Sequence, residues 1–215
     1  MLAPLRQHIF RISLRHAART FADHGWAVTP GGYFNGQRMA CDRPTCWASS
    51  CHPLLPDWET ASVTLSGGWW HDKPHSVLLP TGRSFDAIEV PALVGSSMRG
   101  TGGPVIITPN GRWIFLVSPG VPLRTELEAR IDIVHHGAGS WIPAPPTVLP
   151  EGEVRWHLSP RQVGWQLAEA REAQTALLSA LVALDASFLD RPADVRPPRR
   201  VVRRSAMEAD LHRAS

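Results

Sequence analysis

Apolar residues recur at helical spacing near both ends of the chain. From residue 5 to residue 25 they repeat every three or four positions, which predicts an amphipathic helix that Gly25 ends. A second apolar stripe runs through residues 160–189, where Ser159 and Pro160 supply a helix cap and a first helical residue. We therefore expect a long C-terminal helix whose stripe packs either on the body of the protein or on a second copy of the chain.

Between the two helices, short apolar runs bounded by turn residues predict β-strands. These runs fall within residues 26–30, 75–82, 85–90, 104–109, 112–119, 130–137, 140–146 and 154–158. Asn110-Gly111 separates two of them and predicts a hairpin, and a further strand pair is expected around Gly137 and Gly139. A short helix is expected within residues 61–71. This order of elements favours an α+β fold with a mixed or mostly antiparallel sheet.

The positive charge of the chain is concentrated at its C-terminal end. Residues 191–215 contain seven arginines and three acidic residues; without them the 22 basic and 19 acidic residues of the chain fall to 15 and 16. We expect this Pro- and Arg-rich tail to be disordered. It either contacts nucleic acid or an acidic partner, or simply keeps the protein in solution. The arginines expected to contact nucleic acid are Arg199, Arg200, Arg203 and Arg204.

Several classes of protein do not fit the sequence. No run of 18 apolar residues is present, so no transmembrane helix is expected. The N-terminal segment lacks the apolar core and the cleavage site of a signal peptide. We therefore expect a cytoplasmic protein that does not bind a membrane. The chain also lacks a P-loop, a G-x-G-x-x-G turn before a helix and a G-x-S-x-G nucleophile motif.

The three cysteines lie close together and raise the possibility of a zinc site. Zinc needs four nitrogen or sulfur ligands in a tetrahedron, and such a set is offered by Cys41, Cys46, Cys51 and His52. Their C-x4-C-x4-C-H spacing differs from the usual C-x2-C pattern, and a remote histidine, His71 or His75, could replace His52. The alternative is that the cysteines are ordinary buried side chains and a free thiol. Disulfides are not expected in a cytosolic chain.

Residues 84–91, SFDAIEVP, predict a strand that carries acidic side chains. Successive side chains of a strand point to opposite faces, so Asp86 and Glu89, three positions apart, would face opposite sides of the sheet. They could share a metal ion only if a bulge brought them together. The segment is therefore either a metal-binding strand that has lost its spacing or an ordinary strand with two acidic residues.

Five segments follow one another in an order that one protein family shares. They are RHAARTFADHGWAVTP, CDRPTCWASSCHP, WWHDKPHSVLLPTGRSFDAIEVP, GRWIFLVSPG and IDIVHHGAGSWIPAPPTVLPEGEVRW. Together they resemble the N-terminal domain of bifunctional DNA primase/polymerases, the prim-pol domain, and most closely its divergent actinobacterial branch. The likeness covers about residues 15–160. It implies an archaeo-eukaryotic primase-like fold with an RRM-like half, in which helices flank a mixed sheet.

The resemblance also gives the domain organisation that we expect. A prim-pol-like domain spans residues 1–159, an amphipathic helix spans residues 160–190, and the disordered basic tail spans residues 191–215.

The chemistry that the resemblance implies is nucleotidyl transfer with two Mg²⁺ or Mn²⁺ ions held by carboxylates. Active members carry Asp-x-Asp or Asp-x-Glu on one strand, a histidine on a following strand and a third carboxylate further along. In this order, the resemblance matches these positions to Glu89, Pro91, Trp113 and Asp132. Pro91 cannot bind a metal and Trp113 replaces the histidine, so we expect weakened or lost catalysis.

Other side chains are candidates for the same site or for contact with nucleic acid. Asp86 is a further catalytic candidate, and in an active protein Arg112 would meet the triphosphate of a nucleotide. His135 or His136 could touch a phosphate, with a surface role as the alternative. Stacking on bases, or alternatively packing in the core, is expected of Trp69, Trp70 and Trp141.

These observations lead to two main hypotheses. The first is a divergent DNA primase/polymerase that performs template-dependent nucleotidyl transfer in DNA replication or mobile-element maintenance, beside a separately encoded helicase. The second is a catalytically inactive nucleic-acid-binding or regulatory module that forms a homodimer through its C-terminal helix. A zinc-stabilised scaffold for protein interactions, with no nucleic-acid role, is a third hypothesis.

Overall fold

The computed structural model describes residues 2–41, 50–59, 68–98 and 100–189. The helices are α1 (Leu2–Asp23), α2 (Ala92–Ser97), α3 (Thr125–Glu128) and α4 (Ala170–Leu189). The strands are β1 (Thr29–Gly31), β2 (Tyr33–Phe34), β3 (Met39–Ala40), β4 (Ser76–Pro80), β5 (Asp86–Pro91), β6 (Val105–Thr108), β7 (Arg112–Val117), β8 (Val134–His136), β9 (Trp141–Ala144), β10 (Val148–Leu149), β11 (Gly152–Glu153) and β12 (Arg155–Leu158). The combination of helices with several sheets confirms the α+β class. Among the described helices, none is long and apolar enough to cross a membrane.

A five-stranded antiparallel sheet forms the centre of the molecule, in the order β12-β6-β7-β5-β8. β6 and β7 form the hairpin that Asn110-Gly111 predicts, and Gly111 has the positive φ of 79° that suits glycine in this turn. β5 lies between β7 and β8 and carries both Asp86 and Glu89. Side chains of both neighbouring strands therefore reach the acidic residues of β5.

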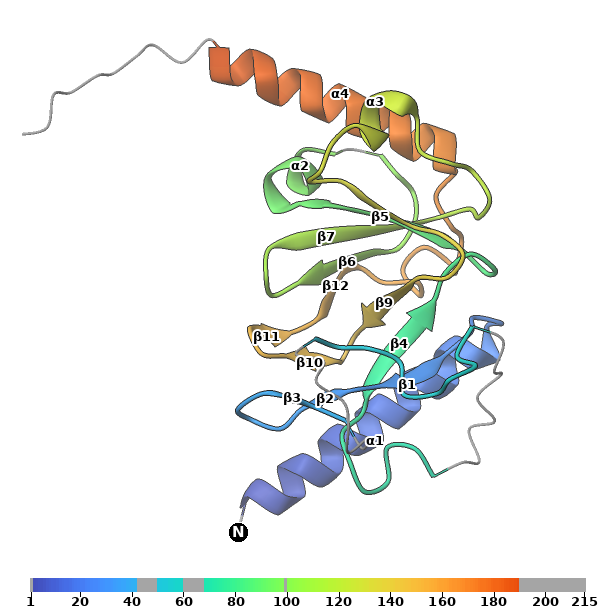
Figure 1. Ribbon diagram of the computed structural model, residues 1–215, viewed down its shortest axis with the longest axis vertical. Helices are drawn as coiled ribbons and strands as arrows, with labels where there is room; N and C mark the ends of the chain where they lie inside the picture. Colours follow the sequence, from blue (N-terminus) through green and yellow to red (C-terminus); the bar gives the residue numbers. More distant parts are fainter. Residues whose placement is uncertain (1, 42–49, 60–67, 99, 190–215) are drawn as a thin grey trace, which may run out of the picture.

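A smaller antiparallel sheet, in the order β1-β4-β9, lies between the central sheet and α1. Two short strand pairs, β2–β3 and β10–β11, lie beside it. Figure 1 shows the layers in order: α4 with α2 and α3 at one end, the five-stranded sheet, the smaller sheet, and α1 at the other end. The five-stranded sheet is thus covered by helices on one face and by the smaller sheet on the other.

Two apolar cores join these layers. The first includes Leu14 of α1, Leu79 of β4 and Ile114 of β7, and it fills the space between α1 and the two sheets. The second includes Phe115 of β7 and Leu177 of α4, and it lies on the other face of the central sheet. Leu177 is fully buried, so the apolar stripe of the C-terminal helix packs on the body of the protein.

The C-terminal helix begins at Ala170, and the prediction that it begins at Pro160 is wrong. Pro160 opens a turn instead, in which its carbonyl accepts a hydrogen bond at 2.7 Å from the N–H of Trp165. Trp165 has a φ of 64°, a conformation that a right-handed helix cannot continue. Ala168 then pairs with the end of β7, and the Ser118 hydroxyl accepts the N–H of Ala170 at 3.1 Å. The sheet thus takes the segment that the apolar pattern assigns to the helix.

The prediction that residues 130–146 form a strand pair around Gly137 and Gly139 is also wrong. β8 pairs with β5 of the central sheet, whereas β9 pairs with β4 of the smaller sheet, so this segment crosses between the sheets. Where it crosses, the segment lies against Gly82: a Cβ added to Gly82 would be only 2.4 Å from the Cα of Ala138. An apolar pattern predicts a strand without identifying its partner, which explains the error.

The short helix predicted within residues 61–71 is not supported where it can be seen. Residues 69–71 form a turn, and residues 60–67 lie outside the described residues. A one-and-a-half-turn helix is instead found at α2, in a segment whose apolar and small residues give no clear period.

Candidate functional site

Asp86 and Glu89 lie on opposite faces of β5, as the alternation of a strand predicts. β5 pairs with β7 in continuous register from Asp86 to Pro91. Asp86 shares its face with Val90, which belongs to the core beneath α4. Glu89 shares the other face with Ala87, which belongs to the core toward the smaller sheet. The two acidic residues therefore belong to two separate environments.

Both carboxylate oxygens of Glu89 are engaged by neighbouring strands. Arg112 of β7 donates from Nε to Oε1 at 2.7 Å, and His136 Nε2 of β8 lies 3.0 Å from Oε2. A carboxylate only accepts, so His136 carries its proton on Nε2. Its other ring nitrogen lies 2.9 Å from the hydroxyl of Ser140. We call Glu89, Arg112 and His136 the Glu89 centre; their side chains are 22%, 21% and 15% exposed.

The pKa of Glu89 is lowered by its two neighbours, His136 and Arg112. Burial is the largest single influence and acts to raise the pKa, but the hydrogen bonds and charges of His136 and Arg112 together outweigh it. The pKa of Glu89 therefore lies below its ordinary value, and the carboxylate is ionised at neutral pH. Its negative charge is compensated within the protein.

Asp132 lies just before β8, and its carboxylate has a different partner. Arg130 donates to it from Nε and Nη2, both at 3.0 Å, and this hydrogen bonding lowers the pKa of Asp132. The Asp132 carbonyl, not its carboxylate, accepts from Arg112 Nη2 at 2.8 Å. Arg112 thus links Glu89 to the main chain of Asp132, while each acidic side chain is paired with its own arginine.

These residues do not fit a pair of Mg²⁺ or Mn²⁺ ions. Each ion needs several oxygen ligands, usually from more than one carboxylate. Pro91 supplies none, the two oxygens of Glu89 hold Arg112 and His136, and Asp132 holds Arg130. Across the described part of the chain, no group of three or more His, Cys, Asp or Glu side chains is placed to hold a metal ion. The Glu89 centre has the side chains of Arg112 and His136 where a metal-dependent site needs metal ions.

The side chain that faces Glu89 from β7 is Arg112, and Trp113 faces the other way. Trp113 pairs with Val90, an added Cβ at Gly95 of α2 would lie 2.6 Å from Trp113 Cβ, and the indole ring lies 4.4 Å from the ring of His157. The residue matched to the family histidine is therefore on the opposite face of the sheet from Glu89. Alternation along residues 112–117 could have given this placement from the sequence.

His136 and Ser140 are the parts of the site that the sequence did not connect with Glu89. His136 was a candidate for phosphate contact, but its ring is occupied by Glu89 and Ser140. The alternation of side chains along a strand could have indicated this, because adjacent histidines on a strand point to opposite faces and only one of the two can share the face of Glu89. His135 accordingly lies on the face of Asp86, with Nε2 3.5 Å from Asp86 Oδ2.

The Asp86 environment is buried on the face of the central sheet that α4 covers. The Asp86 side chain is 4% exposed, and its Oδ2 accepts the N–H of Gly120 at 2.8 Å. Its Oδ1 has no hydrogen-bond partner among the described residues. Since Asp86 cannot reach the face of Glu89, the structure does not bring the two residues together as one catalytic pair.

The zinc candidates are only partly described. Cys46 lies outside the described residues, whereas Cys51 donates to the carbonyl of Gly32 at 3.5 Å and His52 Nδ1 lies 3.0 Å from the Ser50 carbonyl. Burial raises the pKa of Cys51 to about 11, which disfavours the thiolate that zinc requires.

The tryptophans expected to stack on bases pack against other side chains of the protein, and the tail arginines lie outside the described residues. Trp70 is 2% exposed and donates to the His75 carbonyl, so it is a core residue. Trp69 packs edge-on against His75, and Trp141 packs edge-on against Trp58. The tail arginines Arg199, Arg200, Arg203 and Arg204 lie outside the described residues.

Comparison with known families supplies the identity that the geometry leaves open. The family described as "Bifunctional DNA primase/polymerase, N-terminal" matches residues 18–173, a span that includes both sheets and the start of α4. No curated protein matches the chain. Because the matched span is well over half of the sequence, the chain belongs to the prim-pol family of DNA primase/polymerase domains.

Proposed function

We propose that this protein is a prim-pol family member that has lost nucleotidyl transfer and binds nucleic acid without a catalytic metal. The observation that carries the proposal is the Glu89 centre, where both carboxylate oxygens are held by Arg112 and His136. A metal ion entering there would have to displace an arginine held at 2.7 Å and a histidine held at 3.0 Å. The side chains that remain would still offer too few carboxylates for two ions.

The arrangement also disfavours the role that Arg112 would play in an active enzyme. An arginine that meets a triphosphate must have donors to give it, but Arg112 already donates to Glu89 and to the Asp132 carbonyl. The same contacts explain why the arginine is present: it compensates the charge of Glu89 in the absence of metal. A site of this kind stabilises the sheet and does not perform phosphoryl chemistry.

Binding to nucleic acid is supported by the family and by the charge of α1. This helix exposes Arg6, Arg15 and Arg19 and contains one acidic residue, Asp23, at its end. Cationic side chains on one element bind phosphates and release counterions, which gives affinity without a metal. We assign the polymer as DNA, in replication or mobile-element maintenance, with a separately encoded helicase as the expected partner.

The test is a primer-extension and de novo primer-synthesis assay with Mg²⁺ and with Mn²⁺, run on the wild type and on Glu89→Ala beside an active prim-pol enzyme. We expect no incorporation by either form, while the same wild-type sample binds DNA in EDTA. Incorporation by the wild type that disappears in Glu89→Ala would contradict the proposal and favour a working polymerase.

A sample that contains stoichiometric zinc and retains no DNA or RNA at about 0.15 M salt would instead point to a protein-interaction scaffold, since surface charges are only moderately screened at that salt.

A further inference from the structure

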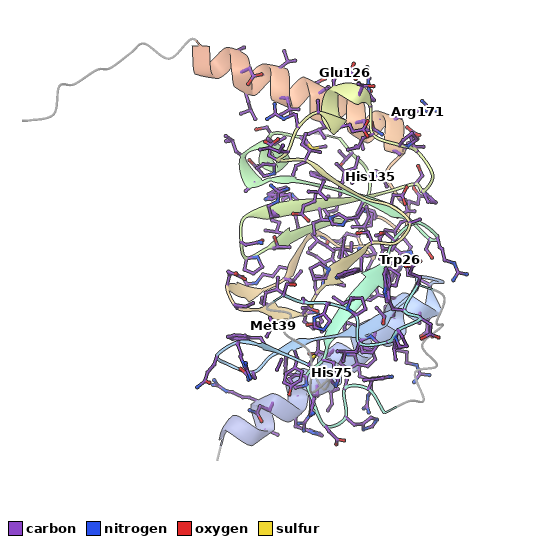
Figure 2. The ribbon with its side chains drawn as sticks, in the orientation of Figure 1. Trp26, Met39, His75, Glu126, His135 and Arg171 are labelled. Carbon is purple, nitrogen blue, oxygen red and sulfur yellow. The ribbon has the colours of Figure 1, made fainter. Side chains whose placement is uncertain are left out.

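A pocket of about 480 Å³ lies between α1, the β2–β3 hairpin and residues 72–74. It is distinct from the Glu89 centre. In Figure 2, His75, which follows the pocket residue Pro74, is labelled close to α1, whereas His135 is labelled in the central sheet. The size is that of a typical small-molecule pocket, for which about 300–1,000 Å³ is usual.

Aromatic side chains form part of the pocket wall. Phe10 comes from α1, and Tyr33 and Phe34 form strand β2. Tyr33 packs edge-on against His75, with ring centroids 5.4 Å apart. The hairpin that presents these rings is closed by Asn35, whose side-chain oxygen accepts the N–H groups of residues 37 and 38 at 3.0 Å each. A planar ring in this pocket would therefore meet aromatic partners.

The same pocket holds a cation with an unsatisfied donor. Arg11 lines it and donates from Nη1 to the Asp72 carbonyl at 3.1 Å, which holds the guanidinium in place. Its Nε is buried and has no hydrogen-bond partner among the described residues. A buried donor without an acceptor is destabilising. An acceptor oxygen of a ligand that reached Nε would remove this penalty.

The charge of the pocket favours an anionic ligand. Arg11 and Lys73 line it together with one acidic residue, Asp72, so the cations are in excess. Lys73 is the only lysine of the chain. Aromatic rings beside arginine and lysine are the combination that binds the bases and phosphates of nucleic acids.

Outside the pocket, positive charge continues along α1. Arg15 and Arg19 follow Arg11 at four-residue spacing, so the three lie on one side of the helix over about 12 Å. Arg15 contacts His71 at 3.1 Å, while Arg19 has, among the residues that the structure describes, only a loose, exposed pairing with Asp23 at 3.9 Å. We call Arg11, Arg15 and Arg19 the arginine ridge. A single-stranded nucleic acid with one base in the pocket could therefore place its next phosphates along this ridge.

We propose that the pocket binds one nucleotide of a single-stranded nucleic acid, with its base against the aromatic rings and its phosphate toward Arg11 and Lys73. This inference rests on the proposed nucleic-acid-binding function and names the site where recognition occurs. Binding is independent of metal and of the Glu89 centre. A free nucleotide offers the same chemistry, and the experiment separates the two sources.

The experiment measures binding of a fluorescein-labelled twelve-residue oligo(dT) and, separately, of dTMP, both in EDTA. The variants are Arg11→Gln and Tyr33→Leu, and the matched control is Arg171→Gln, an exposed arginine on α4 at the opposite end of the molecule. We expect each pocket variant to weaken oligonucleotide binding about tenfold, because Tyr33→Leu removes a ring on which a base stacks and Arg11→Gln removes a cation that faces a phosphate. The control should bind like the wild type, and all variants should show wild-type circular dichroism.

A second readout does not depend on substitutions. An oligonucleotide with 5-iodouracil is irradiated with the wild-type protein, and the crosslinked peptide is identified by mass spectrometry. We expect the crosslink at Phe10, Tyr33 or Phe34. Loss of dTMP binding in the pocket variants, with unchanged oligonucleotide binding, would support a free nucleotide as the ligand of the same site.

Two outcomes would overturn the proposal, and they differ in their reach. In the first, both pocket variants bind oligo(dT) and dTMP like the wild type, and the crosslinks lie outside the pocket. This result would exclude the pocket as the binding site but leave the proposed function intact. Failure of the wild type to bind oligo(dT), duplex DNA and dTMP removes both.

Discussion

The Glu89 centre and the pocket beside α1 each contain an arginine among polar groups, but their hydrogen bonding differs. Arg112 donates to the Glu89 carboxylate and to the Asp132 carbonyl, and His136 completes the carboxylate. Within the described part of the chain, Arg11 has one hydrogen bond, to a main-chain carbonyl, and a buried Nε without a partner. Arg112 is therefore hydrogen-bonded to acceptors within the protein, whereas Arg11 keeps a donor, Nε, that has no partner among the described residues.

The difference teaches where binding can occur in this fold. A ligand at the Glu89 centre must first break charge-assisted hydrogen bonds, which are among the strongest in proteins. In the proposed binding mode, a ligand at the pocket leaves the bond of Arg11 to the Asp72 carbonyl in place and offers an acceptor to a donor that is already desolvated. We infer that the site the family uses for chemistry has become structural here, and that recognition has moved to another face.

The largest effect that tests this comparison is on stability. Arg112→Ala removes the shorter of the two hydrogen bonds to the Glu89 carboxylate, which is mostly buried, so we expect a loss of about 2 kcal/mol in the free energy of unfolding, between the values for exposed and buried pairs. The measurement is urea unfolding followed by tryptophan fluorescence. Arg155→Ala, which breaks the largely exposed pair with Glu153, should cost less than about 1 kcal/mol.

A double-mutant cycle makes this test specific. If the cost comes from the unpaired carboxylate, Glu89→Gln should recover part of it, so that the double variant is more stable than the sum of the single losses predicts. Equal losses for Arg112→Ala and Arg155→Ala would show that the Glu89 centre is not held together by its charges, and the comparison would fail.

A smaller effect is expected on the salt dependence of binding. Arg15→Gln with Arg19→Gln removes two cations from the ridge, so the slope of log affinity against log salt for oligo(dT) should fall by about 1.4, at about 0.7 for each phosphate contact to a single strand. The control, Arg155→Gln with Arg171→Gln, removes the same charge from elsewhere on the surface. Equal changes in slope for the two double variants would mean that binding is not localised to α1.

The elements of this fold were largely predictable because their signals are local. Short apolar runs bounded by turn residues predicted β4, β5, β6 and β7, and Asn110-Gly111 predicted the hairpin between the last two. The alternation of side chains along a strand placed Asp86 and Glu89 on opposite faces, where the structure has them. Such patterns work because the side-chain period of a strand is fixed.

What could not be predicted depends on pairing between distant segments. Glu89 meets Arg112 and His136 only because β7 and β8 flank β5, and these residues are 23 and 47 positions away in the chain. No local pattern contains that register. The start of α4 was missed for a similar reason, because Ala168 pairs with β7 instead of joining the helix.

The pocket was missed because its residues gave no shared signal. Tyr33 and Phe34 lie in a segment that looks like a loop, and Arg11 belongs to a helix whose pattern predicts only its buried side. They become a site when the β2–β3 hairpin folds beside α1, which is a tertiary event.

The smallest expected effect concerns pH, and it sharpens the claim that Glu89 is satisfied within the protein. Its pKa is lowered below the ordinary value of 4.5, because His136 and Arg112 outweigh the effect of burial. A carboxylate with a lowered pKa contributes stability that is fully present above its ordinary pKa and is lost as pH falls through the pKa of the folded state. Unfolding free energies of the wild type and of Glu89→Gln are therefore compared from pH 7 to pH 3. The advantage of the wild type should be constant above about pH 5 and shrink below it, since other carboxylates titrate in both proteins and cancel in the difference. A difference that stays constant down to pH 3 would mean that the charge of Glu89 contributes nothing to the stability of the fold. The claim that Arg112 and His136 satisfy the Glu89 carboxylate within the protein would then fail.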